Sequence, residues 1–121
     1  MKTSDLQGAA LDYAVAHCEN LKLGTEQYVV GVASEDGTYY KPSTNWAQGG
    51  PIIEREKISL FRYGESHSSV WTALAYFDEC YFDISSNDGT GVEGETPLIA
   101  AMRCYVASKL GDEVEIPEKL L

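Results

Sequence analysis

The sequence predicts an α+β fold in which one helix near each end of the chain packs on an antiparallel β-sheet. Three observations carry this prediction: helical periodicity near the N-terminus, an apolar helical segment near the C-terminus, and β-branched and aromatic runs between them. Strands and helices do not alternate, and no GxGxxG or Walker-type loop is present. The 121 residues fit a single domain, residues 1–121, with residues 111–121 as an acidic C-terminal tail.

The first predicted element is an amphipathic helix over residues ~5–19. Ser4 and Gln7 have the spacing of a capping box, in which each side chain bonds the backbone of the other residue. His17 falls near the C-terminal end, where a helix dipole stabilises a surface histidine, and we interpret it in that way rather than as catalytic.

A series of β segments follows the first helix. The predicted strands are residues 27–33, 38–40, 57–63, 70–77 and 80–84. Asp36-Gly37 predicts a tight hairpin turn between the first two. Residues 70–77 also fit a short buried helix, but their aromatic and β-branched content favours a strand. Residues 85–95 are predicted to be a mobile polar loop, whose spacing does not match a calcium-binding EF-hand.

The last predicted element is a helix over residues 98–110. Thr96 is a typical N-cap, Pro97 suits the first helical position, and Gly111 suits the C-terminal end. Because most of the circumference of this helix is apolar, it must be buried. The acidic tail after it is expected to lie on the surface.

The segment Pro42–Arg55 is predicted to be a loop between two strands and is the main site candidate. It combines two prolines, the pair Gly49-Gly50 and a tryptophan, which is unusual for a simple connection. The two glycines would allow positive φ and close approach of a partner. Trp46 would either fill the core or meet a ligand.

Composition limits the function classes. The formal net charge of −10 makes direct binding to DNA, RNA or an anionic membrane unfavourable. No long apolar run or signal sequence is visible, which predicts a cytoplasmic protein. Cys18, Cys80 and Cys104 are odd in number and lack CxxC spacing, so we interpret them as reduced thiols.

Catalytic and metal-binding patterns are sparse. A dyad of Cys104 with His67 would place the thiol inside an apolar helix, where it would be unreactive. Glu54, Glu56 and Asp12 are the best set for a hard cation, but no standard ligand spacing supports them. The sequence therefore predicts no catalytic residues, no metal and no cofactor, and favours a non-enzymatic protein.

Binding of a small nucleotide-like ligand is better supported. Hydroxyl and amide side chains could contact ribose, base or phosphate, and glycine N–H groups could hold an anion. The rings of Trp46 and of either Tyr39 or Tyr40 could stack on a base. Arginine side chains could bind phosphate in a bidentate way. The predicted ligand-binding residues are Tyr40, Ser43, Thr44, Asn45, Trp46, Gln48, Gly49, Gly50, Arg55 and Arg103. Structural alternatives stay open, including burial of Arg103 against Glu54 or Asp12 and turn-capping by Ser43 and Thr44.

Two blocks resemble a known family. The segments Pro42–Arg55 and Thr96–Gly111, together with residues 6–16, are similar to the NinX-like proteins of phages and prophages. Asn45 and Tyr13 stand where the family has Asp and Trp, and the region between Arg55 and Glu95 is only loosely similar. The family is one of unknown function, so the resemblance implies a phage accessory protein and transfers no catalytic residues.

Three functional hypotheses follow. The resemblance and the site candidate together favour a counter-defence protein in the infected host cell, which sequesters a small nucleotide-derived signal and forms a homo-oligomer. The alternatives are an acidic inhibitor that binds a host enzyme, and a hydrolase of a phosphorylated metabolite.

Overall fold

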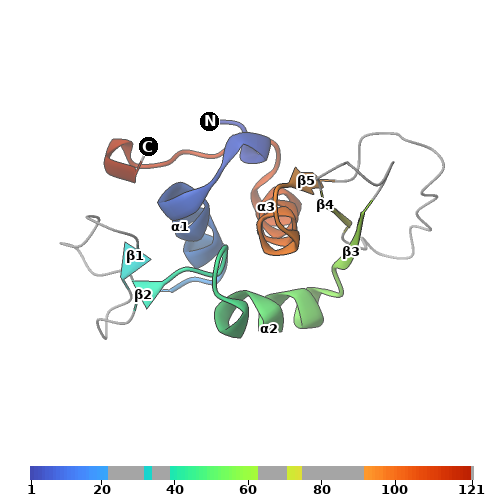
Figure 1. The fold of residues 1–121 in the computed structure, drawn as a ribbon. Coiled ribbons are helices and arrows are strands. Elements are labelled where there is room, and N and C mark those ends of the chain that lie inside the picture. The colour runs from blue at the N-terminus through green and yellow to red at the C-terminus, as the bar shows by residue number, and fades with distance from the viewer. Residues whose placement is uncertain (22–31, 34–38, 63–70, 75–91, 121) are drawn as a thin grey trace.

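The computed structural model describes residues 1–21, 32–33, 39–62, 71–74 and 92–120. Its elements in chain order are the 3-10 helix η1 (Thr3–Asp5), α1 (Gly8–Cys18), β1 (Val32–Ala33), β2 (Tyr39–Tyr40), α2 (Trp46–Glu56), β3 (Ser59–Arg62), β4 (Trp71–Leu74), β5 (Val92–Gly94), α3 (Pro97–Leu110) and the 3-10 helix η3 (Glu118–Leu120). In Figure 1, α3 is central, with the sheet β3–β4–β5 on one side, α1 on the other and α2 below both. The predicted α+β class is confirmed.

The antiparallel sheet has the order β3-β4-β5. Ser59 pairs with Leu74, and Trp71 pairs with Gly94. The strands predicted over residues 57–63 and 70–77 are therefore confirmed over residues 59–62 and 71–74, while residues 63, 70 and 75–77 lie outside the described residues. The polar loop predicted over residues 85–95 is wrong at its end, because residues 92–94 form β5. The absence of a side chain at Gly94 allows β5 to pack closely on α3, since a Cβ on Gly94 would lie 2.5 Å from the backbone nitrogen of Ala100.

A separate two-stranded ribbon is formed by β1 and β2, in which Val32 pairs with Tyr40. This pairing confirms that the chain returns antiparallel after residue 33, as the Asp36-Gly37 signal predicts. The turn itself, the first part of strand 27–33, and the predicted strand 80–84 lie outside the described residues, as do His67, Cys80 and the remainder of loop 85–95.

The predicted N-terminal helix is confirmed, but its start is wrong. Ser4 and Gln7 form no capping box, because Ser4 belongs to η1 and α1 begins only at Gly8. Between them Leu6 is extended, with φ −68° and ψ 136°, and its side chain is fully buried. Burial of Leu6 thus overrides the local capping pattern. His17 is exposed near the end of α1, as predicted.

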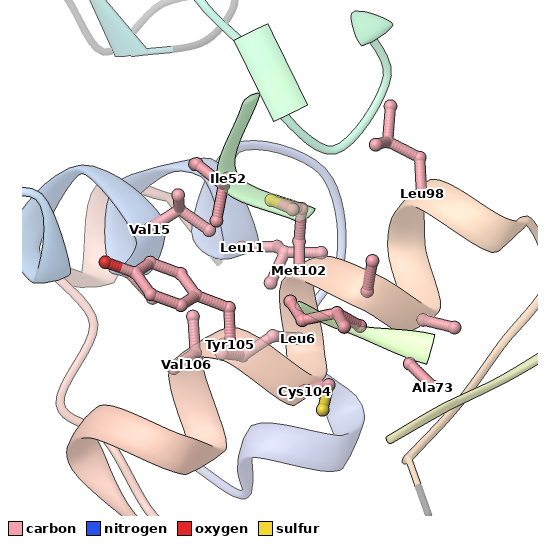
Figure 2. Packing of buried hydrophobic residues seen from close by; sticks show 14 of the residues in the cluster. Leu6, Leu11, Val15, Ile52, Ala73, Leu98, Met102, Cys104, Tyr105 and Val106 are labelled. Carbon is pink, nitrogen blue, oxygen red and sulfur yellow. The ribbon is translucent and has the colours of Figure 1, made fainter. Parts of the chain in front are cut away.

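Helix α3 agrees closely with its prediction. Thr96 caps it by accepting a hydrogen bond of 3.1 Å from the N–H of Ile99, and Gly111 ends it with φ +87°. Its buried residues are Leu98, Ala100, Ala101, Met102, Cys104, Tyr105 and Val106. Figure 2 shows how they meet the other helices, with Leu11 and Val15 from α1 and Ile52 from α2 packed beside Met102 and Tyr105.

The segment Pro42–Arg55 is not the predicted loop, since most of it forms α2. Asn45 caps this helix by accepting a 2.9 Å hydrogen bond from the N–H of Ala47, and Ile52 anchors it in the core. Pro51 lies inside the helix despite lacking an N–H donor. Tertiary packing therefore outweighs the unfavourable helix propensities of proline and glycine.

The segment after α3 lies on the surface, as predicted, with most of its described residues exposed. It is also attached to the N-terminus, because the N–H of Val114 donates to the carbonyl of Met1 over 2.9 Å. Val114 and Leu120 are buried, so they fix this segment against the helices. No helix within the described ranges is long and apolar enough to cross a membrane.

Candidate functional site

Two large aromatic side chains are exposed where β2 meets the start of α2. Tyr39 is 53% exposed and Trp46 is 54% exposed. We call these two residues, together with Lys41, Thr44 and Gln48, the aromatic corner. Trp46 is the first residue of α2, and its ring lies against Gly50 one turn later. The alternative that Trp46 fills the core is therefore wrong.

Gln48 holds the two parts of the aromatic corner together. Its side-chain nitrogen donates to the carbonyl of Tyr39 over 2.9 Å, and its side-chain oxygen accepts from the N–H of Lys41 over 2.7 Å. Gln48 thus acts as a brace between β2 and α2, so both ends of its amide are already bonded. Thr44 and Asn45 precede the helix, and the Asn45 side chain serves as its cap.

A buried hydrogen bond attaches the entry of α2 to α1. The N–H of Ser43 donates to a carboxylate oxygen of Asp12 over 2.9 Å, and both residues are buried. This backbone N–H, rather than the Ser43 hydroxyl, makes the well-aligned bond. Burial raises the pKa of Asp12, whereas the hydrogen bonding from Ser43 and the positive charge of Lys41 oppose the rise. Ser43 is therefore an anchor of the corner.

The two predicted site glycines are both helical and have different surroundings. The N–H of Gly49 bonds the carbonyl of Asn45 over 2.9 Å and so belongs to the first turn of α2. Neither Gly49 nor Gly50 has positive φ, contrary to expectation. Gly49 is buried, and it is packed so closely that an added Cβ would lie 2.5 Å from the carbonyl oxygen of Pro42.

Arg55 lies at the far end of α2, inside a group of charged and aromatic side chains. We call this group the arginine cluster, and its members are Glu19, Arg55, Glu56, Tyr105 and Lys109. Arg55 binds both carboxylate oxygens of Glu19, over 2.9 Å and 2.7 Å, and a carboxylate oxygen of Glu56 over 3.0 Å. Its guanidinium also lies 5.7 Å from the centre of the Tyr105 ring. These contacts occupy the donors that a phosphate would need.

The remaining members complete the arginine cluster. The Tyr105 hydroxyl donates to Glu19, and Lys109 lies 3.2 Å from Glu56. The hydrogen bonds from Arg55 lower the pKa of Glu19 and of Glu56 below that of an ordinary glutamate. Burial, followed by the negative charges of Glu19 and Asp12, raises the pKa of nearby Tyr40 to about 12. The cluster joins α1, α2 and α3 by charge-assisted bonds.

Arg103 does not join Arg55. It donates to the backbone carbonyls of Leu6, over 2.6 Å, and of Glu93, over 2.9 Å. Burial lowers its pKa, while the charges of Glu95 and Asp5 act in the opposite direction. The expected partners Glu54 and Asp12 are therefore wrong for Arg103, whose role is to connect α3 with the chain before α1 and with β5.

The ten predicted ligand residues thus do not form one site. Thr44, Asn45, Trp46, Gln48 and Gly50 accompany the corner, Ser43 and Gly49 are buried beneath it, and Arg55 and Arg103 lie elsewhere. Tyr40 is half-buried next to Tyr39 in β2. Of the two tyrosines considered for stacking, Tyr39 is the exposed one, and the alternation of a β-strand places it on the opposite face from Tyr40.

Sequence reasoning also missed most of the arginine cluster. Tyr105 and Lys109 are four residues apart in α3, a spacing that places them on one face and could have indicated a shared partner. Nothing in the sequence indicates that Glu19 approaches them.

Among the residues that the structure describes, no group of three or more His, Cys, Asp or Glu side chains could hold a metal ion. Burial raises the pKa of Cys18 to about 11.

The fold and the site together define a small α+β protein with a braced aromatic surface at the entry to its middle helix. The family described as "Bacteriophage P22, NinX" matches residues 2–109. The chain belongs to this NinX family and is a phage accessory protein, which confirms the resemblance seen in its sequence. No curated protein matches the chain. The predicted ligand, partners and homo-oligomer stay predictions.

Proposed function

We propose that the chain is a non-enzymatic phage accessory protein that binds a host protein in the cytoplasm of the infected cell. The observation that carries this proposal is the exposure of Trp46 and Tyr39 on the aromatic corner. Tryptophan and tyrosine are the residues that most often dominate binding energy at protein interfaces. About half of each ring is in contact with water, and a docked partner would gain free energy by covering this apolar surface.

The rigidity of the corner supports the same proposal. Asn45 caps α2, Gln48 braces it to β2, and Asp12 holds Ser43 from below. A surface held in its binding conformation loses little conformational entropy when a partner docks, so more of the contact energy appears as affinity. The counter-defence role follows if the bound host protein belongs to a defence pathway.

A nucleotide-derived ligand is the second candidate. An exposed indole offers a stacking face for a base, and exposed Lys41 beside it offers a positive charge for phosphate. Arg55 gives less support, because Glu19 and Glu56 already bind it.

Capture from host lysate on the immobilised full chain tests the proposal. We expect one stoichiometric host protein to be retained, and Trp46→Ala to weaken its binding about tenfold or more, as truncation of a central aromatic typically does. Leu21→Ala is the matched control, since Leu21 is a large apolar side chain that is 40% exposed outside the corner. A partner retained equally by both variants would overturn the role of the corner.

Thermal unfolding with a panel of nucleotides separates the second candidate from the first. A ligand at about a hundredfold its dissociation constant should stabilise the protein by about 2.7 kcal/mol. If stabilisation occurs and Trp46→Ala removes it, the ligand replaces the host protein as the proposed partner. No retained protein and no stabilising nucleotide would reject both candidates.

A further inference from the structure

A surface pocket, separate from the aromatic corner, lies between α1 and the chain that follows α3. This pocket has a volume of about 350 Å³, within the range of small-ligand sites. It is lined by Tyr13, Ala14, His17, Leu110, Glu113, Val114, Glu115 and Ile116. We call it the tail pocket. In Figure 1 the segment after α3 passes along the side of the helices that is turned away from α2.

The lining has two chemically distinct parts. Ala14, Val114 and Ile116 are buried or half-buried and provide an apolar floor. Glu113 and Glu115 are exposed and stand two residues apart, on either side of buried Val114. In an extended segment this spacing directs two side chains to the same face. The pocket therefore has an apolar interior and an acidic rim.

Tyr13 adds a third feature that selects a cation. Its ring lines the pocket together with the carboxylates, and a positive group over the face of an aromatic ring is attracted to it. Arginine and lysine side chains have an apolar stem and a charged head, so they match a floor and rim of this kind. The same segment already receives one ammonium group, because the N-terminus of Met1 donates to the carbonyl of Val114 over 3.0 Å.

We propose that the tail pocket binds an arginine or lysine side chain from an exposed basic segment of a partner protein. Charge supports this choice of occupant: the chain has 9 basic and 19 acidic residues, so its field attracts a basic partner. The larger groove of about 770 Å³ beside Arg103 is lined by four acidic residues but also by two basic ones, Lys2 and Arg103. The tail pocket contains neither of them.

This inference goes beyond the proposed function, since it concerns a different surface and fails independently of it. Trp46→Ala tests the aromatic corner without changing the tail pocket, and substitutions in the tail pocket leave the corner intact. A partner that uses both surfaces would contact the corner through apolar groups and the tail pocket through a basic side chain.

Nuclear magnetic resonance of the isotope-labelled full chain tests the proposal with the peptide acetyl-Gly-Arg-Gly-amide. We expect saturable shifts in the backbone signals of residues 13–17 and 113–116. Acetyl-Gly-Leu-Gly-amide, which has an apolar side chain without a charge, should leave these signals unchanged. Equal shifts with both peptides, or none with the arginine peptide, would overturn the proposal.

Two substitutions that each remove one negative charge distinguish binding in the tail pocket from unspecific attraction to the acidic protein. Glu115→Gln should weaken the arginine peptide about threefold or more, as loss of an exposed ion pair allows, and adding Glu113→Gln should weaken it further. Glu118→Gln is the matched control, because it removes the same charge from an exposed position in the same segment, outside the pocket. An equal effect of Glu118→Gln would mean bulk attraction only and would reject the site. Tighter binding of free spermidine than of the peptide would reject a protein segment as the occupant.

Discussion

At the scale of single residues, the adjacent glycines of α2 differ in what surrounds them. Gly49 faces inward, where an added Cβ would lie 2.5 Å from the carbonyl oxygen of Pro42 and 2.6 Å from a methyl group of Leu98. Gly50 faces Trp46, whose nearest atom would be 3.9 Å away, an ordinary contact. The need for glycine at position 49 therefore comes from packing of α2 against the backbone of Pro42 and against Leu98 of α3.

We expect Gly49→Ala to destabilise the protein by about 1–3 kcal/mol, because the backbone of Pro42 cannot move aside as a flexible side chain can. Gly50→Ala is the matched control and should change stability by less than about 1 kcal/mol, since the better helix propensity of alanine is offset by contact of its Cβ with the ring of Pro51. Urea unfolding of both variants measures the difference. A Gly49→Ala variant as stable as Gly50→Ala would contradict the close approach seen between the helices.

At the scale of elements, the sequence predicts those whose ends carry clear signals. Thr96, Pro97 and Gly111 delimit α3, alternation identifies β3, and aromatic and β-branched content favours β4. Helix α2 is missed because Gly49, Gly50 and Pro51 are poor helix formers, and the contacts that compensate come from other parts of the chain. Ile52 in the core and the Arg55–Glu19 ion pair are such contacts. Asn45 is a local signal that could have revealed the start.

Asn45→Ala should therefore destabilise the protein by about 1 kcal/mol, because the first turn of α2 loses its side-chain acceptor. Asn45→Asp keeps an acceptor oxygen and places a negative charge at the positive end of the helix dipole, so its stability should equal or exceed that of the wild type. Chemical unfolding compares the three proteins. Similar losses in both variants would contradict capping as the function of this side chain.

At the scale of the whole molecule, the arginine cluster is the feature that connects all three helices. Glu19 ends α1, Arg55 and Glu56 end α2, and Tyr105 and Lys109 lie in α3. The sequence marks Arg55 as important, yet it cannot show that the partner is a carboxylate 36 residues earlier in the chain. The candidate site could be predicted in its location around Trp46. Its chemistry could not, because burial of Ser43 and the pairing of Arg55 depend on the tertiary fold.

The cluster makes stability depend on pH with a definite sign. Hydrogen bonds from Arg55 lower the pKa of Glu19 below its ordinary value of 4.5, so the folded state holds this proton less tightly than the unfolded state. The stabilisation is fully present above pH 4.5 and is lost as the pH falls through the lowered pKa. Asp12 has a raised pKa, so its contribution has the opposite sign and declines as the pH rises.

Glu19→Gln should remove the contribution of Glu19 to the free energy of unfolding, which is the contribution that is lost in acid. We expect it to lower the free energy of unfolding by about 1 kcal/mol at neutral pH, since a bidentate, half-exposed ion pair is lost. The loss of stability between pH ~6 and pH ~3 should then be smaller than in the wild type, because one titrating group is absent. Glu54→Gln is the control, because Glu54 is an exposed acid of the same α2 outside the cluster. Urea unfolding across this pH range measures all three proteins. A Glu19→Gln variant that keeps the full acid dependence of the wild type would show that the cluster does not connect the helices energetically, whatever its geometry.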